Sequence, residues 1–170
     1  MIWVVQSACC FLFSLAPLNT DVCNLFNPGP TRKPNGNDQP RVVFIVSTVN
    51  LVLQQKERFE AFLGDKYSVA DISGSNCAEI PLKFLLQNND VVVMTAMILV
   101  NALKATEKGN RVELGDISLL LFDECHHAHK EHPYNSIMEM YLALKSQAGH
   151  QQRLPQVRRD KHWLPINRYD

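Results

Sequence analysis

Four consecutive residues, Asp123-Glu124-Cys125-His126, are the part of this chain whose types and spacing could do chemistry. They follow an apolar run, residues 117–122, that is typical of a buried strand. A carboxylate at the end of such a strand can hold Mg²⁺ beside a phosphate, because Mg²⁺ prefers hard oxygen ligands and keeps several of its waters. A second carboxylate can orient or deprotonate an attacking water. An acidic pair alone more often caps the next helix, so the dipeptide by itself does not establish a site.

The elements that would position these residues begin at Arg41, where short β-branched runs start to alternate with amphipathic segments. Such alternation with short connections predicts an α/β fold with a parallel sheet and right-handed crossovers. We expect Gly64 to end the first helix and Pro81 to lie in the first turn of the second. The expected strands are 42–46, 67–72, 91–94 and 117–122, and the expected helices are 50–63, 78–86, 96–104 and 135–145.

Polar residues follow each of the expected strands. In a parallel α/β sheet ligands bind at the carboxyl ends of the strands, so these residues should meet at one edge. An isolated Ser or Thr at such a place is most often a turn or a helix cap, and only the joint placement favours a binding site. The residues are Ser47 and Thr48, Ser73 and Gly74, Thr95, and Asp123 and Glu124.

Composition limits the possible classes of protein but does not identify one. The 170 residues fit one domain, and Lys plus Arg equals Asp plus Glu at 17 each, so net charge indicates neither nucleic-acid nor membrane binding. The five cysteines are odd in number and form no C-x-x-C pair, which argues against a disulfide framework or a zinc ribbon. We therefore expect a reducing compartment and a cytoplasmic location.

The first 40 residues differ in composition from the rest. Residues 8–18 are apolar like the core of a signal peptide, yet no Lys or Arg precedes Arg32, and the run is too short for a membrane span. A signal or anchor is thus the minor alternative. Residues 27–40 contain four prolines, two glycines and three asparagines, which is typical of a linker.

Four histidines, His126, His127, His129 and His132, lie within seven residues. A transition-metal site is one interpretation, but the spacing lacks the H-E-x-x-H pattern, and Pro133 indicates a loop or a helix start. We favour a polar loop.

In its context the tetrapeptide is more specific, because it resembles motif II of the superfamily 2 helicases. Residues 123–135, DECHHAHKEHPYN, together with 41–55, 72–74 and 93–99, resemble in order and spacing the helicase domain of the RIG-I-like receptors, cytosolic sensors of viral double-stranded RNA. Dicer helicase domains are similar and also have a DECH box and a His-Pro-Tyr segment. The pair His126-His127, Asn135 and residues 154–157 favour the receptors.

The resemblance implies a RecA-like first helicase domain with ATP and Mg²⁺ as cofactors. It implies that Asp123 coordinates Mg²⁺ and that Glu124 is the general base. It further implies that His126 couples the nucleotide site to the RNA-binding face, with Cys125 as a small apolar filler. Contacts to phosphate and 2′-OH, which read shape rather than sequence, would come from strand-end residues. Those residues are Ser47, Thr48, Val49, Ser73, Gly74, Thr95, Ala96 and Met97.

Two expected motifs are missing from the printed chain. It has no G-x-x-x-x-G-K-[ST] loop, and residues 158–170 hold no Thr-Ala-Ser stretch like that of motif III. We expect a partial helicase domain at 41–157 between non-homologous segments at 1–40 and 158–170, with the other helicase and signalling domains of a full-length receptor as partners and no membrane contact. Such a chain should hydrolyse ATP poorly alone. The open alternatives are a Dicer-type domain, a non-catalytic RNA-binding or regulatory fragment, and a poorly folding product with an exposed sheet edge.

Overall fold

The computed structural model describes residues 2–5, 41–74, 80–107, 109, 111–123, 132–147 and 154–155. Its centre is a five-stranded, entirely parallel sheet with the order β1-β5-β2-β4-β3. This confirms the predicted α/β class and is consistent with a partial RecA-like helicase domain. The strands are β1 (Ile2–Val5), β2 (Val42–Val46), β3 (Val69–Ile72), β4 (Val91–Thr95) and β5 (Leu119–Asp123).

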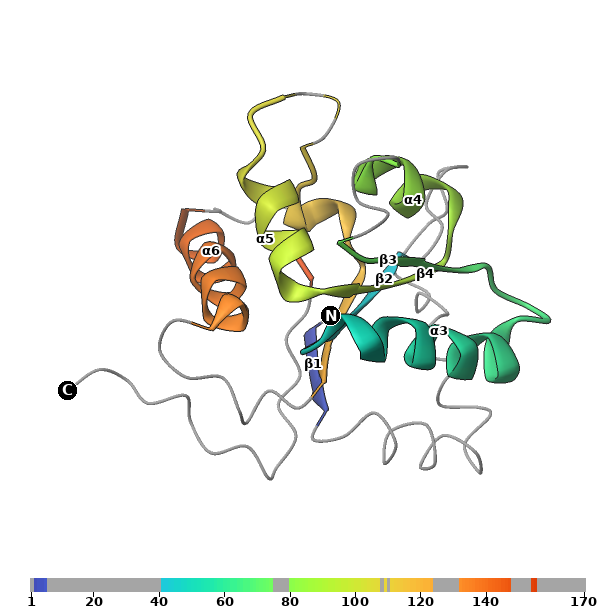
Figure 1. Ribbon diagram of the computed structural model, residues 1–170. Coiled ribbons are helices and arrows are strands. Elements are labelled where there is room, and N and C mark those ends of the chain that lie inside the picture. The colour runs from blue at the N-terminus through green and yellow to red at the C-terminus, as the bar shows by residue number, and fades with distance from the viewer. Residues whose placement is uncertain are drawn as a thin grey trace, which may run out of the picture.

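Helices cover both faces of the sheet (Figure 1). On one face α3 (Val49–Leu63) packs against β4 and β3 and, to a lesser extent, β2. On the other face lie α4 (Leu82–Asn88), α5 (Ala96–Lys104) and α6 (Pro133–Gln147), with a short 3-10 turn, η1 (Leu114–Asp116), before β5. None of the helices within the described residues combines the length and apolarity that a membrane span requires.

Each face of the sheet has its own core because successive strand residues point to opposite sides. On the α3 side Phe44 of β2 meets Phe59 of α3 edge to face, with ring centroids 5.0 Å apart. On the other side Ile45, Met94 and Phe122 pack against residues of α5 and α6. The central strands β2, β4 and β5 are buried along nearly their whole length, which explains their continuous apolar runs.

Several predicted boundaries differ from those in the structure by one to four residues. The strand expected at 117–122 is Leu119–Asp123, because the Ile117 N–H closes η1 on the Leu114 carbonyl. Asp123 is therefore the last residue of the strand and not the first after it. The helix expected at 78–86 is Leu82–Asn88, and Pro81 precedes it as the N-cap with ψ of 133°, its carbonyl accepting the N–H groups of Phe84 and Leu85.

Gly64 ends α3 as predicted, but in right-handed helical conformation, with its N–H donating to the Glu60 carbonyl. A Cβ at this position would lie 2.5 Å from the Glu60 carbonyl oxygen. Close backbone approach, and not a positive φ, is therefore what favours glycine here.

The strand β1 was not expected from the sequence. Ile2–Val5 pairs in parallel with Leu120–Asp123, so β5 is an inner strand flanked by β1 and β2. The two edge strands of the described sheet are therefore β1 and β3.

Candidate functional site

The carboxyl ends of the strands form one row across the sheet. The register aligns Val4, Phe122, Ile45, Met94 and Ile72 as successive neighbours. One residue further along each strand this row becomes Val5, Asp123, Val46, Thr95 and Ser73. The strand register therefore brings the polar residues at the strand ends to one edge of the sheet, as predicted.

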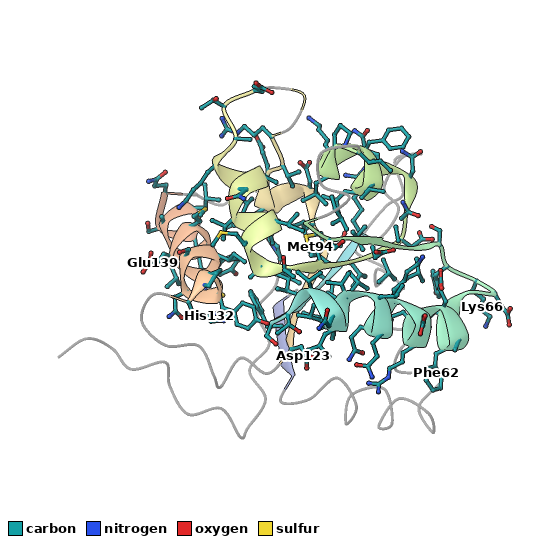
Figure 2. All side chains as sticks on the ribbon, in the orientation of Figure 1. Phe62, Lys66, Met94, Asp123, His132 and Glu139 are labelled. Atoms are coloured by element: carbon teal, nitrogen blue, oxygen red, sulfur yellow. The ribbon has the colours of Figure 1, made fainter. Side chains whose placement is uncertain are left out.

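Strand alternation places Asp123 on the α3 side of the sheet. Leu121 and Leu119, two and four residues earlier, belong to the core under α3, and the period of two continues to Asp123. Thr95 follows Val91 and Val93 on the same side. Asp123 is only 3% exposed, so its carboxylate lies in a shielded position at the edge. Figure 2 shows Asp123 at the end of α3 opposite to Phe62 and Lys66.

The amino ends of α3 and α5 also lie at this edge, because α3 starts directly after β2 and α5 directly after β4. Their N-cap residues are Thr48 and Thr95, and within the described residues neither hydroxyl makes the cap hydrogen bond to its helix. Neither helix has an acidic residue in its first turn. The positive ends of two helix dipoles therefore lie at this edge, together with two threonines whose hydroxyls are not used in capping, and a helix N-terminus favours an anion such as a phosphate.

The predicted RNA-contact residues divide by exposure. Ser73 and Ala96 are buried, at 8% and 4% exposure. Thr95 is half-buried. The exposed residues are Ser47, Thr48, Val49, Gly74 and Met97.

Two predicted site residues, Glu124 and His126, lie outside the described residues, as do Cys125, His127 and His129. His132 is described at the start of α6, where its Nδ1 accepts the Tyr134 N–H at 3.3 Å. Among the residues that the structure describes, no three His, Cys, Asp or Glu side chains are grouped to hold a metal ion.

The donor set present at the edge is compatible with Mg²⁺ as a nucleotide partner. Mg²⁺ in such sites takes one or two carboxylates and completes its shell with water and phosphate oxygens. The shielded Asp123 carboxylate would supply the hard anionic oxygen, and Thr95 lies on the same side of the sheet. Asp123 therefore fits the role that the resemblance implies for it.

Tyr134 is a residue of this site that the sequence analysis did not single out. Its hydroxyl donates to the backbone carbonyl of Asp123 at 2.9 Å, and its ring is 3% exposed. The only sequence signal was an aromatic residue directly after Pro133, which does not identify a hydrogen-bond partner.

Comparison with known proteins shows the family of this chain. Residues 31–147 match the family described as type III restriction enzyme, res subunit. The human antiviral innate immune response receptor RIG-I is 40% identical over 118 residues, which cover 69% of this chain and 12% of the receptor. The mouse ATP-dependent RNA helicase DHX58 is 36% identical over 120 residues, 71% of this chain and 17% of the helicase.

The endoribonuclease Dicer-S of Xenopus laevis is 37% identical over 102 residues, 59% of this chain and 5% of that protein. The chain therefore spans less than a fifth of the length of each of these relatives. The matches confirm the resemblance to the RIG-I-like receptors, with the Dicer proteins second. The chain belongs to the type III restriction enzyme res-subunit family, and within it resembles the helicase domain of the RIG-I-like receptors.

Proposed function

We propose that this chain is a segment of an ATP-dependent RNA helicase of the RIG-I-like type, with nucleotide and double-stranded RNA bound along the carboxyl edge of its sheet. The observation that supports this most directly is the pair of N-cap threonines, Thr48 and Thr95, whose hydroxyls do not cap their helices. A capping role is the ordinary reason for Thr at these positions. Its absence leaves both hydroxyls available to an external acceptor.

On the nucleotide side, Asp123 would hold Mg²⁺, Glu124 would act as the general base, and His126 would couple this site to the RNA face. When bound, ATP with Mg²⁺ supplies the phosphoanhydride to be cleaved and a cation that neutralises its charge. The shielded position of Asp123 would strengthen electrostatic interactions with such a cation relative to bulk water. The printed chain contains no G-x-x-x-x-G-K-[ST] loop, so we expect this chain alone to hydrolyse ATP poorly or not at all.

On the RNA side, contacts would come from hydroxyls, backbone N–H groups and helix N-termini. No Lys or Arg is present among the described residues that directly follow the strand ends, which read Ser-Thr-Val-Asn at 47–50, Ser-Gly at 73–74 and Ala-Met-Ile at 96–98. Such neutral donors bind phosphate and 2′-OH groups and recognise the shape of an A-form duplex rather than its sequence. Antiviral sensing of such RNA in the cytoplasm, together with further helicase and signalling domains, is the parent activity that we propose.

The test is RNA binding by the full chain with a matched pair of threonine variants. Thr48→Ala removes a hydroxyl at the carboxyl edge, and Thr106→Ala removes one from a threonine that is also exposed but follows α5, toward the opposite edge. We expect Thr48→Ala to weaken binding to a short RNA duplex about fivefold, the size of one hydrogen bond, and Thr106→Ala to leave it unchanged. Because Thr48 makes no cap bond, its thermal stability should stay close to that of the unmodified chain.

Salt dependence and turnover complete the test. The affinity for the duplex should fall only shallowly with salt, because few cations are released by neutral contacts. If Thr48→Ala and Thr106→Ala changed the affinity for the duplex equally, RNA would bind elsewhere on the chain. A steep decrease of affinity with salt concentration would also reject this interface. RNA-stimulated ATP turnover that disappears in Glu124→Gln would contradict the expectation that the chain is inactive alone.

A further inference from the structure

Gln55 is a buried polar residue of α3 whose hydrogen bonding the fold leaves incomplete. It is 3% exposed, and within the described part of the chain its Oε1 accepts no hydrogen bond. The other two buried residues of this helix, Val52 and Phe59, are apolar. A desolvated acceptor without a donor is unfavourable, so packing of the helix on the sheet does not explain a glutamine at this position.

The direction of Gln55 across the sheet follows from its neighbours on α3. Lys56 contacts Asp71 of the edge strand β3, with Nζ 3.3 Å from Oδ1. Phe59 contacts Phe44 of β2, with ring centroids 5.0 Å apart. At 3.6 residues per turn, Phe59 lies about 60° around the helix from Lys56, and Gln55 lies about 40° further in the same sense. The rotation that leads from β3 to β2 therefore directs Gln55 past β2 toward β5.

The level of Gln55 along the strands follows from the rise of the helix. Helix α3 starts at the carboxyl edge, and Gln55 is one turn, about 6 Å, nearer to that edge than Phe59. Two strand residues span about the same length, so Gln55 lies at the level of Val46, two residues beyond Phe44. Val46 belongs to the core under α3, and the register of β2 with β5, continued by one residue, places Asp123 beside it.

Gln55 and Asp123 therefore bring two buried acceptors to one place. Asp123 is also 3% exposed, and an ionised carboxylate, like an amide oxygen, accepts hydrogen bonds and donates none. A donor or a cation between two such groups is favourable to both. A hydrated cation meets this need, because it binds a carboxylate directly while its waters donate to a second acceptor.

We propose that Gln55 is a further residue of the cation site at Asp123, and that its amide oxygen accepts a hydrogen bond from a water of the bound Mg²⁺. This inference rests on the proposed function, of which it uses only Asp123 as the ligand of the cation. Gln55 is a positioning residue, since it acts through the water shell and does not replace Asp123 as the ligand.

The experiment compares Gln55→Met with Gln54→Met in the full chain. Gln54 is the matched control because it precedes Gln55 on the same helix and is exposed. The probe is Mn²⁺ alone, titrated by electron paramagnetic resonance. We expect Gln55→Met to weaken Mn²⁺ binding about tenfold and Gln54→Met to change it less than about twofold. The melting temperature of metal-free Gln55→Met should not fall, so that loss of the fold does not account for weaker binding.

Gln55→Glu gives a readout that a purely structural role would not change. A second carboxylate beside Asp123 is unfavourable without a cation, so this variant should melt at a lower temperature when metal-free. At one fixed Mn²⁺ concentration, the rise in melting temperature should be largest in Gln55→Glu, smaller in the unmodified chain and smallest in Gln55→Met. Equal rises in the three proteins, or equal Mn²⁺ affinities of Gln55→Met and Gln54→Met, overturn the proposal. Should Gln55→Glu fail to fold, the two methionine variants decide.

Asp123→Asn separates this inference from the proposed function. If Asp123→Asn abolishes Mn²⁺ binding while Gln55→Met binds like the unmodified chain, the cation site stands and Gln55 has no part in it. If Asp123→Asn binds Mn²⁺ as tightly as the unmodified chain, or if the unmodified chain binds none, the nucleotide site proposed at Asp123 fails and the role of Gln55 fails with it.

Discussion

The Nζ atom of Lys56 on α3 lies 3.3 Å from Oδ1 of Asp71 on β3 and 3.6 Å from Oε1 of Glu60 on its own helix. The Lys56 and Asp71 side chains are both largely shielded, at 26% and 21% exposure. The ion pair links α3 to the edge strand β3 at Asp71, two residues before Ser73. It therefore helps to hold the α3 and β3 parts of the candidate RNA surface together.

This ion pair predicts a stability difference that depends on pH. Burial lowers the pKa of Lys56, but the hydrogen bond and charge of Asp71 and the charge of Glu60 outweigh it, so the pKa lies above the ordinary 10.5. A raised pKa stabilises the fold below the unfolded value, and this stability is lost as pH rises through the folded pKa. We expect Lys56→Met to lower the free energy of unfolding by about 0.5 kcal/mol near neutral pH. Urea unfolding should show this difference closing well above pH 10.5; a constant difference would assign it to packing.

Tyr141 predicts a second change in the free energy of unfolding at alkaline pH. Burial raises the pKa of its hydroxyl above 10, and the hydroxyl donates to the Pro155 carbonyl. The contribution is complete below the unfolded pKa and is lost as pH rises above it. We expect Tyr141→Phe to lower the free energy of unfolding by about 1 kcal/mol at neutral pH. The two free energies of unfolding should converge in alkaline buffer, and a difference that does not change with pH would contradict the raised pKa of Tyr141.

Gln55 predicts a stabilising substitution. It faces the sheet from α3 at 3% exposure, and its Oε1 accepts no hydrogen bond from the residues that the structure describes. A desolvated acceptor without a partner is unfavourable, so Gln55→Met, which keeps a similar length, should raise the free energy of unfolding by about 1 kcal/mol. The neighbouring Gln54 is exposed, and Gln54→Met should stay within about 0.5 kcal/mol of the parent. A loss of stability in Gln55→Met alone would show that the amide is needed.

The pairing of β1 with β5 predicts unequal effects of two neighbouring prolines. Adjacent N–H groups in a strand point to opposite sides, so only one of Val4 and Val5 can donate toward β5. Proline removes one ladder bond where the N–H faces the partner and is tolerated on the free side of an edge strand. We expect Val4→Pro and Val5→Pro to differ by about 1 kcal/mol or more in thermal unfolding. If neither proline changes the melting temperature, β1 does not contribute to the sheet.

Several elements were predictable because their signals are local. The helix at Ala96–Lys104 and the strand at Val42–Val46 match their predicted bounds, since period and β-branching are properties of a few consecutive residues. The joint position of Ser73, Thr95 and Asp123 followed from the rule that parallel strands end at one edge. Pro81 was misplaced because proline is acceptable both in a first turn and just before it, and only the backbone conformation distinguishes the two.

The sequence by itself determined the family, the α/β class and the edge of the sheet at which the candidate site is proposed, because motif order and hydrophobic period need no knowledge of distant contacts. Tertiary structure decided what depends on residues far apart in the chain. Ile2–Val5 became a strand only by pairing with β5, more than a hundred residues away. The Tyr134 hydroxyl can donate to the Asp123 carbonyl only because Tyr134 of α6 packs against Phe122 of β5. Hydrogen-bond partners of this kind depend on three-dimensional proximity, which no local pattern specifies.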